Sequence, residues 1–171
     1  MASEIGVQTI QHTNGTDAMT IDSSGRVLKP QVPAFMLSLT SGQALTASNS
    51  WTTVSNMVDS DTNCFTQGGM SLSSGVITVP VAGVYHFSAD IRVDGIGSSY
   101  FWVMIAKNDS TTVGVNHNFL NGSPDVNYDT FSMSGAYQMS ANDTVRVKVY
   151  SGSDTSYTVQ SHSHFSGFLV G

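Results

Sequence analysis

The histidine pair near the carboxyl end has the residue type and spacing that could bind a metal ion. His162 and His164 flank a single serine, and on a strand this spacing would point both imidazoles to one face. The surrounding sequence supplies no carboxylate or cysteine to complete four ligands. We therefore expect polar surface or subunit packing at this pair, with an ion shared between copies on a symmetry axis as the alternative.

Aspartates in predicted turns are the second group that could hold a metal ion, because calcium prefers oxygen ligands. These residues are Asp59, Asp61, Asp94, Asp125, Asp129 and Asp154. None has the spacing of a dedicated calcium loop, and aspartates in turns commonly accept hydrogen bonds from their own backbone. We expect that turn role for them, and keep calcium on a symmetry axis as the alternative.

The sequence contains no motif of a known catalytic chemistry. A phosphate-binding Gly-Lys-Ser/Thr loop, a His-Glu-x-x-His helix and a Gly-x-Ser-x-Gly elbow are all missing. Glu4 is the only glutamate, and the single cysteine, Cys64, has no partner for an internal disulfide. Nothing pairs an aspartate with a histidine as acid and base, so the chain is expected not to be an enzyme and to need no cofactor.

The composition excludes further classes of function. Charged residues make up 11% of the 171 residues, against roughly 25% in an ordinary domain. The six basic residues are scattered and the net charge is -6, which argues against nucleic acid as a partner. There is no apolar run long enough to cross a membrane, and no secretory signal at the start. We expect synthesis in a cytoplasm.

Two regions differ in pattern along the chain. Residues 1–32 contain two short alternating runs broken by Asn14-Gly15 and Ser23-Ser24-Gly25, which are turn signals. So few apolar residues cannot form a core of their own, and we interpret this region as an extension that orders against a partner. Pro30 and Pro33 mark the boundary with a domain over residues 33–171.

The domain reads as a succession of short strands separated by Gly, Ser, Asn and Asp. Nine are expected, over residues 34–40, 51–56, 75–80, 84–93, 100–108, 111–117, 129–140, 143–151 and 164–171. Because no segment has a helical period, the fold class is all-β, a sandwich or jelly roll. In the strand over residues 84–93, Tyr85 and Phe87 fall on one face and are expected to anchor the core.

The strand over residues 100–108 is apolar on both faces. One face carries Tyr100, Trp102 and Met104, and the other carries Phe101, Val103 and Ile105. One face covers the core of a two-layer sandwich, so the other needs a second cover. We expect a neighbouring subunit there, with a loop of the same chain as the alternative.

The run Pro80-Val81-Ala82-Gly83-Val84-Tyr85-His86-Phe87 and the terminal Phe165-Ser166-Gly167-Phe168-Leu169 resemble strands of the globular head of the first complement component. That C1q/TNF-like head belongs to the superfamily shared with tumour necrosis factor. The resemblance covers about residues 33–171. It implies a jelly roll of about ten antiparallel strands, a compact homotrimer with residues 100–105 at a subunit interface, and a terminal strand central in its sheet.

Two details accompany this resemblance. Phe165 and Phe168 are expected to be buried, so that Phe168→Ala would cost about 3 to 5 kcal/mol. Where the family often has Gly-Asp before the strand at Val145, this chain has Asn142-Asp143, which we expect to form an equivalent turn.

The segment AMTIDSSGRVLKPQVPAF, residues 18–35, resembles one that is common in fibres and other surface proteins of bacteriophages. This resemblance implies a trimeric fibre or knob head on the virion surface, attached to other virion proteins through the extension. Host contact through a surface glycan or protein is expected at loops over residues 95–99 and 116–129, where the candidates are Phe119, Leu120 and Tyr128. The alternatives are a capsid or tail decoration protein that cements the particle, and a secreted complement- or cytokine-like ligand.

Overall fold

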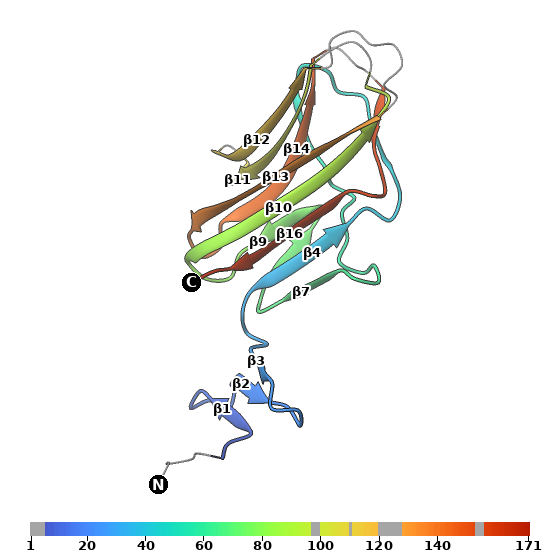
Figure 1. Ribbon diagram of the computed structural model, residues 1–171. Helices are drawn as coiled ribbons and strands as arrows, with labels where there is room; N and C mark the ends of the chain where they lie inside the picture. The colour runs from blue at the N-terminus through green and yellow to red at the C-terminus, as the bar shows by residue number, and fades with distance from the viewer. Residues whose placement is uncertain (1–5, 97–99, 110, 120–127, 153–155) are drawn as a thin grey trace.

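The computed structural model describes residues 6–96, 100–109, 111–119, 128–152 and 156–171, and only the backbone of residues 111–119 and 128. The described residues form strands and turns and no helix, so no helix that could span a bilayer occurs among them. Every strand pairing in the three sheets is antiparallel. The all-β fold class is confirmed (Figure 1).

A seven-stranded sheet forms one layer of the head. Its strands are β4 (Ala34–Ser38), β5 (Gln43–Leu45), β7 (Phe65–Gln67), β10 (Gly83–Asp94), β13 (Tyr128–Met139), β15 (Tyr157–Val159) and β16 (His164–Leu169). The order is β5-β15-β10-β16-β4-β7, with β13 along the other side of β10. The terminal strand β16 therefore lies between β10 and β4, in the central position that the resemblance implied.

A six-stranded sheet forms the second layer. Its strands are β6 (Trp51–Thr53), β8 (Ser71–Ser73), β9 (Val76–Thr78), β11 (Tyr100–Lys107), β12 (Thr111–Phe119) and β14 (Thr144–Ser151). The order is β12-β11-β14-β9-β8, and β6 pairs with β14 beyond the end of β9. The two sheets face each other as an antiparallel sandwich, which confirms the predicted architecture.

The extension forms a small sheet of its own below the head (Figure 1). It consists of β1 (Thr9–Gln11), β2 (Asp17–Ile21) and β3 (Val27–Leu28), paired in that order. Asp22 closes the turn between β2 and β3, because its Oδ1 accepts hydrogen bonds from the backbone N–H groups of Ser24 and Arg26. These bonds and the Arg26 guanidinium lower the pKa of the Asp22 carboxyl.

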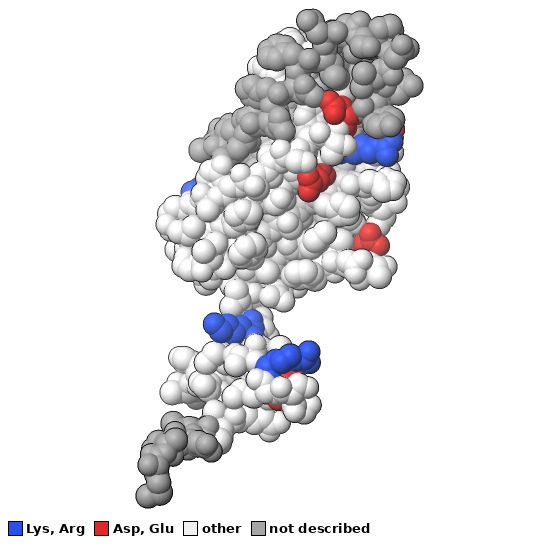
Figure 2. All heavy atoms as spheres, viewed as in Figure 1, with Lys and Arg blue, Asp and Glu red and all other residues white. Residues whose placement is uncertain are grey.

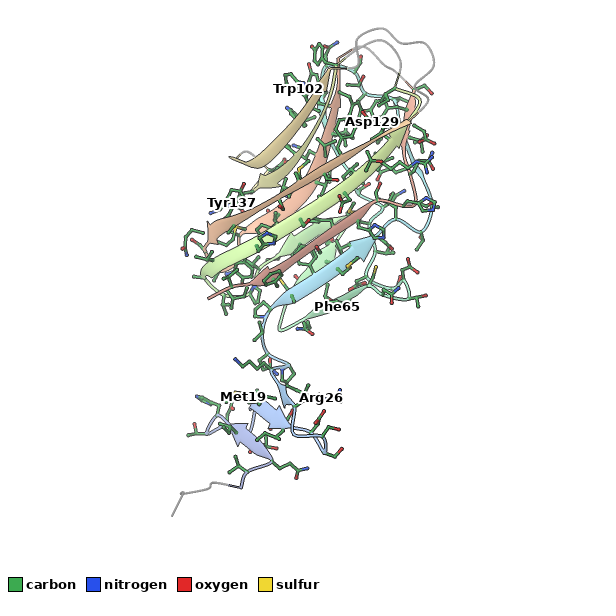
Figure 3. The ribbon with its side chains drawn as sticks, in the orientation of Figure 1. Met19, Arg26, Phe65, Trp102, Asp129 and Tyr137 are labelled. Atoms are coloured by element: carbon green, nitrogen blue, oxygen red, sulfur yellow. The ribbon has the colours of Figure 1, made fainter. Side chains whose placement is uncertain are left out.

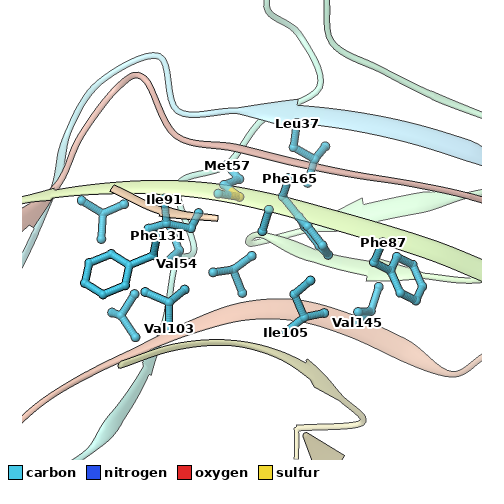
Figure 4. Close-up of a cluster of buried hydrophobic side chains, with 14 of the residues drawn as sticks. Leu37, Val54, Met57, Phe87, Ile91, Val103, Ile105, Phe131, Val145 and Phe165 are labelled. Carbon is cyan, nitrogen blue, oxygen red and sulfur yellow. The ribbon is translucent and has the colours of Figure 1, made fainter. Parts of the chain in front are cut away.

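The core lies between the two large sheets, as Figure 4 shows. Tyr85, Phe87 and Phe165 are fully buried, as predicted. Phe165 packs edge-on against Phe35, with ring centroids 4.9 Å apart. The hydroxyl of Tyr85 donates a hydrogen bond to the Val81 carbonyl, which satisfies the one polar group that this ring brings into the core.

Gly167 makes the close packing of these rings possible. It lies opposite Phe87 in the pairing of β10 with β16. A Cβ atom at this position would lie 2.5 Å from Cδ1 of Phe87 and 2.8 Å from Cε1 of Phe35. Both atoms belong to buried rings that other rings hold in place, so the glycine in the terminal motif is a packing requirement.

Phe168 is not buried, and the expectation that it belongs to the core is wrong. Its side chain is 49% exposed on the outward face of β16. The reason is the two-residue period of a strand, which sends residues an odd number of positions apart to opposite faces. Since Phe165 points inward, Phe168 must point outward, and the predicted cost of 3 to 5 kcal/mol for Phe168→Ala no longer follows.

The turn before β14 explains the replacement of Gly-Asp by Asn-Asp. Asn142 has a φ of 68°, in the left-handed region that glycine favours and asparagine tolerates. Asp143 accepts hydrogen bonds from Asn108 Nδ2, Lys107 Nζ and the Ser140 backbone N–H, at 2.7, 2.8 and 2.7 Å. These donors, Asn108 first, lower the pKa of the Asp143 carboxyl to about 2.

We expect Gly167→Ala to destabilise the domain by about 1 to 3 kcal/mol, because the added methyl group overpacks the core. The control is Ser73→Ala, which removes an exposed hydroxyl from β8 in the other sheet and is expected to stay within about 0.5 kcal/mol of the parent. Urea unfolding at one fixed protein concentration measures both. Equal midpoints for the two variants would contradict the packing role of Gly167.

We expect Asp143→Asn to destabilise the protein most above pH 4 and progressively less as the pH falls to about 2. The folded pKa of Asp143 lies below its ordinary value of 3.8, so the charged form contributes stability above the unfolded pKa and loses it as the carboxyl is protonated. Unfolding curves of parent and variant between pH 2 and pH 7 measure the difference. A difference that does not change with pH would contradict this assignment.

Candidate subunit interface on the seven-stranded sheet

The outward face of the seven-stranded sheet consists of rows of small, mostly uncharged side chains. The strand register fixes three rows, each running from β4 across β16 and β10 to β13. They are Ala34–Phe168–His86–Ala136, Met36–Ser166–Ser88–Ser134 and Ser38–His164–Asp90–Ser132. Ser166 and Ser88 occupy the centre of the middle row, and their short side chains let another protein surface approach closely.

Two apolar groups stand out from this face. The ring of Phe168 packs against the imidazole of His86, with centroids 5.5 Å apart. At the edge of the sheet, Phe65 on β7 pairs with Met36 on β4 and is 43% exposed; Figure 3 labels Phe65 there. Large exposed apolar groups on an otherwise small-residue face are typical of an interaction surface.

Charge is scarce in the three rows, whereas the next outward positions of β10 carry the ion pair of Arg92 and Asp94. Among the twelve residues of the three rows, Asp90 carries the one carboxylate, and it lies opposite His164. Figure 2, which views the molecule from this side, shows the area over β13, β10, β16 and β4 as mainly uncharged. Charged residues are depleted at the centres of protein interfaces because their desolvation is costly.

The outward face of the six-stranded sheet carries a network of ion pairs, in which one carboxylate lies between two cations. Asp109 Oδ1 lies 2.6 Å from Lys148 Nζ and 3.5 Å from Arg146 Nη1. The hydrogen bond from Lys148 lowers the pKa of the Asp109 carboxyl. Lys107 pairs with Asp143 at the start of β14. This network suits a surface in contact with water better than a buried interface.

The strand that is apolar on both faces is β11. Phe101, Val103 and Ile105 enter the core, and each is at most 1% exposed. On the other face, aromatic side chains of neighbouring strands in the same sheet pack beside Trp102, and the alternative of a covering loop is not tested. Trp102 packs against Trp51 of β6 and Tyr150 of β14, with ring centroids 6.1 and 5.2 Å apart.

Tyr100 completes this aromatic cluster. Its ring lies 5.2 Å from that of Trp102 and 6.0 Å from that of Tyr150. All four rings, including Trp51, are half-buried, and Met104 on the same face is 7% exposed. Figure 3 labels Trp102 at one end of the six-stranded sheet. A subunit contact at Tyr100, Trp102 and Met104 stays a prediction.

The histidine pair is not arranged as the sequence spacing implied. Strand β16 begins at His164, while His162 lies exposed in the preceding turn. The two imidazoles therefore do not share one face of one strand. Ser163 between them is buried, and its Oγ accepts a hydrogen bond from the Arg92 backbone N–H. No cluster of three or more potential metal ligands occurs among the described residues.

The aspartates that lie in the described part of the chain have contacts within it. Asp61 accepts a hydrogen bond from Ser38 Oγ at 2.8 Å, and this bond lowers the pKa of its carboxyl. Asp59 accepts one from Thr66 Oγ1, and Asp129 one from the adjacent Thr130 backbone. Asp61 also accepts a hydrogen bond from the Thr62 backbone N–H, as the turn role predicts. Asp94 and Asp129 instead lie in strands β10 and β13, so the turn role is wrong for them. Asp125 and Asp154 lie outside the described residues.

The predicted receptor contacts fall mostly outside the described part of the chain. Leu120 lies wholly outside it, as do the side chains of Phe119 and Tyr128. The backbone places Phe119 at the end of β12, opposite Tyr100, and Tyr128 at the start of β13, opposite Asp94. Host contact at these residues stays a prediction. No pocket is found in the part of the chain that the structure describes.

Comparison with known families decides the relationship of the chain. The family model of the C1q domain matches residues 34–170 of the chain. The chain belongs to the C1q domain family. C1q domains are non-enzymatic globular heads that typically form homotrimers, so the C1q/TNF-like resemblance seen in the sequence is confirmed. No curated protein matches the chain, and its expected origin in a bacteriophage stays a prediction.

The sequence did not identify the small outward residues of this C1q domain as a candidate interface. Ser88, Ser134 and Ser166 do not attract attention individually, because serine is common on any surface. A signal was nevertheless available, since the outward positions of β16 and of the middle of β13 carry no charge. What the sequence could not show is that these positions belong to neighbouring strands and form one continuous face.

Proposed function

We propose that this C1q domain is the trimeric, non-enzymatic head of a bacteriophage surface protein, and that the outward face of its seven-stranded sheet is the subunit interface. The observation that carries the proposal is the row of Ser166, Ser88 and Ser134 beside the exposed Phe168, which packs on the half-buried His86. A closed ring of identical subunits needs a face without repelling charge, and this one meets that need.

The interface residues complement one another in size. The central serines leave a shallow floor, while Phe168 and Phe65 project from it with 49% and 43% of their side chains exposed. A projecting ring on one copy can pack on the serine floor of the next, which is the heterologous contact that a threefold ring requires. Burying both rings would supply the apolar core that stable interfaces have.

The placement on a virion is supported by the sequence before the head. Residues 18–35 resemble a segment of bacteriophage fibre proteins. The extension that contains them lies at the pole of the head opposite the end of β10 and the start of β13 (Figure 1). One pole would then join other virion proteins while the other is presented to the host. Weak sites repeated on three subunits and on many copies gain avidity without catalysis.

The interface is tested by two serine-to-aspartate variants on opposite layers of the sandwich. Light scattering is expected to give the parent and Ser73→Asp a mass of about 54 kDa, three times the chain mass of 18.1 kDa. Ser134→Asp is expected to give folded monomer, since it places a carboxylate of each copy in a dry contact. Both serines are exposed at outward strand positions, so the two variants introduce the same carboxylate in similar surroundings on the two sheets.

A trimer that persists in Ser134→Asp would contradict the interface assigned here. Dissociation caused by Ser73→Asp, with Ser134→Asp still trimeric, would place the contact on the six-stranded sheet instead. Circular dichroism of each variant verifies that the sandwich is retained.

The virion role is tested with antibodies raised against the head. We expect them to label virus particles assembled in cells that express the gene, and to reduce adsorption of those particles to host cells. Antibodies that label particles without any effect on adsorption would favour the decoration protein. Particles without label would contradict a place on the virion.

A further inference from the structure

The sheet of the extension has one face that is apolar and uncovered. The register pairs Ile10 with Met19 and Ile21 with Val27. Because directly paired residues share a face and residues two apart on β2 do as well, these four side chains form one apolar face. Ile10 is 46% and Val27 is 55% exposed, and the other two are only half-buried.

The opposite face of the same sheet is mainly polar. Thr9 pairs with Thr20, which in turn pairs with Leu28. The extension is therefore two-sided, with an apolar side defined by Ile10, Met19, Ile21 and Val27. Three short strands are not stable in water with such a side exposed, so this side requires a cover.

The junction with the head limits what that cover can be. The extension is joined to β4 at Ala34 by residues 29–33, in which the Val32 backbone N–H donates a hydrogen bond to the Lys29 carbonyl. Gln67 Nε2 donates a hydrogen bond to the Val32 carbonyl, and the Leu169 backbone N–H donates one to the Pro33 carbonyl. Strand β4 belongs to the sheet that carries the proposed subunit interface. A trimeric head therefore holds three extensions side by side, at a high effective concentration.

The charges of the extension permit association with itself. Residues 6–32 contain two acidic residues, Asp17 and Asp22, and two basic ones, Arg26 and Lys29. Asp22 and Arg26 pair within one copy, with Arg26 Nε 2.6 Å from Asp22 Oδ2. The apolar side itself consists of uncharged residues, so identical copies can meet there without repulsion.

We propose that the apolar side of the extension packs against the same side of two further copies, so that three small sheets close a three-sided stalk with these four residues in its interior. This inference rests on the trimeric head proposed above, and it assigns the extension a defined partner, namely its own copies. The stalk would be a second trimer-forming element, outside the C1q domain match at residues 34–170.

Two neighbouring residues provide a matched test. Val27 and Leu28 are adjacent in β3, similarly exposed at 55% and 48%, and on opposite faces of the sheet. In the full chain carrying Cys64→Ser, which removes the single native thiol, we expect Val27→Cys to be joined into chain dimers by a short bis-maleimide. The yield should exceed that of Leu28→Cys roughly tenfold, because thiols inside the stalk are held together. Denaturing electrophoresis measures both yields.

The outcomes separate this inference from the proposed function. Trimeric mass with cross-linking at Val27→Cys alone supports the stalk. Trimeric mass with equal yields, or with none at Val27→Cys, overturns the stalk and leaves the head trimer intact, and another protein would then be the partner of the extension. A monomeric parent chain overturns both.

A second measurement does not depend on introduced thiols. Arg26 is the trypsin site of the described extension, because Lys29 is followed by Pro30, and Arg26 is exposed. We expect the double variant Ile10→Ser, Val27→Ser to be cleaved there roughly tenfold faster than the parent, because cleavage follows the open population of the sheet. The control Thr9→Ser, Thr20→Ser, on the other face, should match the parent. Equal cleavage of all three proteins would overturn the stalk.

Discussion

The antiparallel pairing of β10 with β16 is the contact on which the remainder of the structure depends. In this register a large inward residue lies opposite a small one, with Phe87 across from Gly167 and Phe165 across from Ala89. The rings therefore interleave instead of colliding, and Phe35 of β4 packs against Phe165 from the neighbouring strand. A shift of β16 by one residue would turn Phe165 to the outward face and remove it from this cluster of rings.

The same pairing creates the outward face. Once the inward positions are filled with aromatic rings, the alternate positions bring Ser88 beside Ser166 and His86 beside Phe168. The same strand register therefore determines both the core on the inward face of the sheet and the proposed interface on its outward face. Their requirements differ, because the inside needs volume and the outside needs small size and little charge. The ion pairs Lys148–Asp109 and Lys107–Asp143 lie in the other layer, where they do not meet this face.

The head and the extension both have apolar sheet faces that must be buried, and they differ in what is available to bury them. The two large sheets of the head cover each other, so the domain has its own core and leaves only scattered apolar groups outside. The extension has one small sheet, and among the described residues no other segment packs on its apolar side. Its exposed Ile10 and Val27 are for that reason more informative about assembly than the exposed Phe168, which lies on a domain that is already folded.

Much of the fold could be predicted from the sequence. The low charge, the Gly and Asn turns and the two-residue alternation determined an all-β chain with Tyr85 and Phe87 inside, because these properties depend only on neighbouring residues. The prediction for Phe168 was wrong although the same alternation excluded it. Only the tertiary structure decided that Trp51 lies beside Trp102 and that Ser134 and Ser166 flank Ser88. Such pairings join positions far apart in the chain, and strand register, which no local pattern encodes, brings them together.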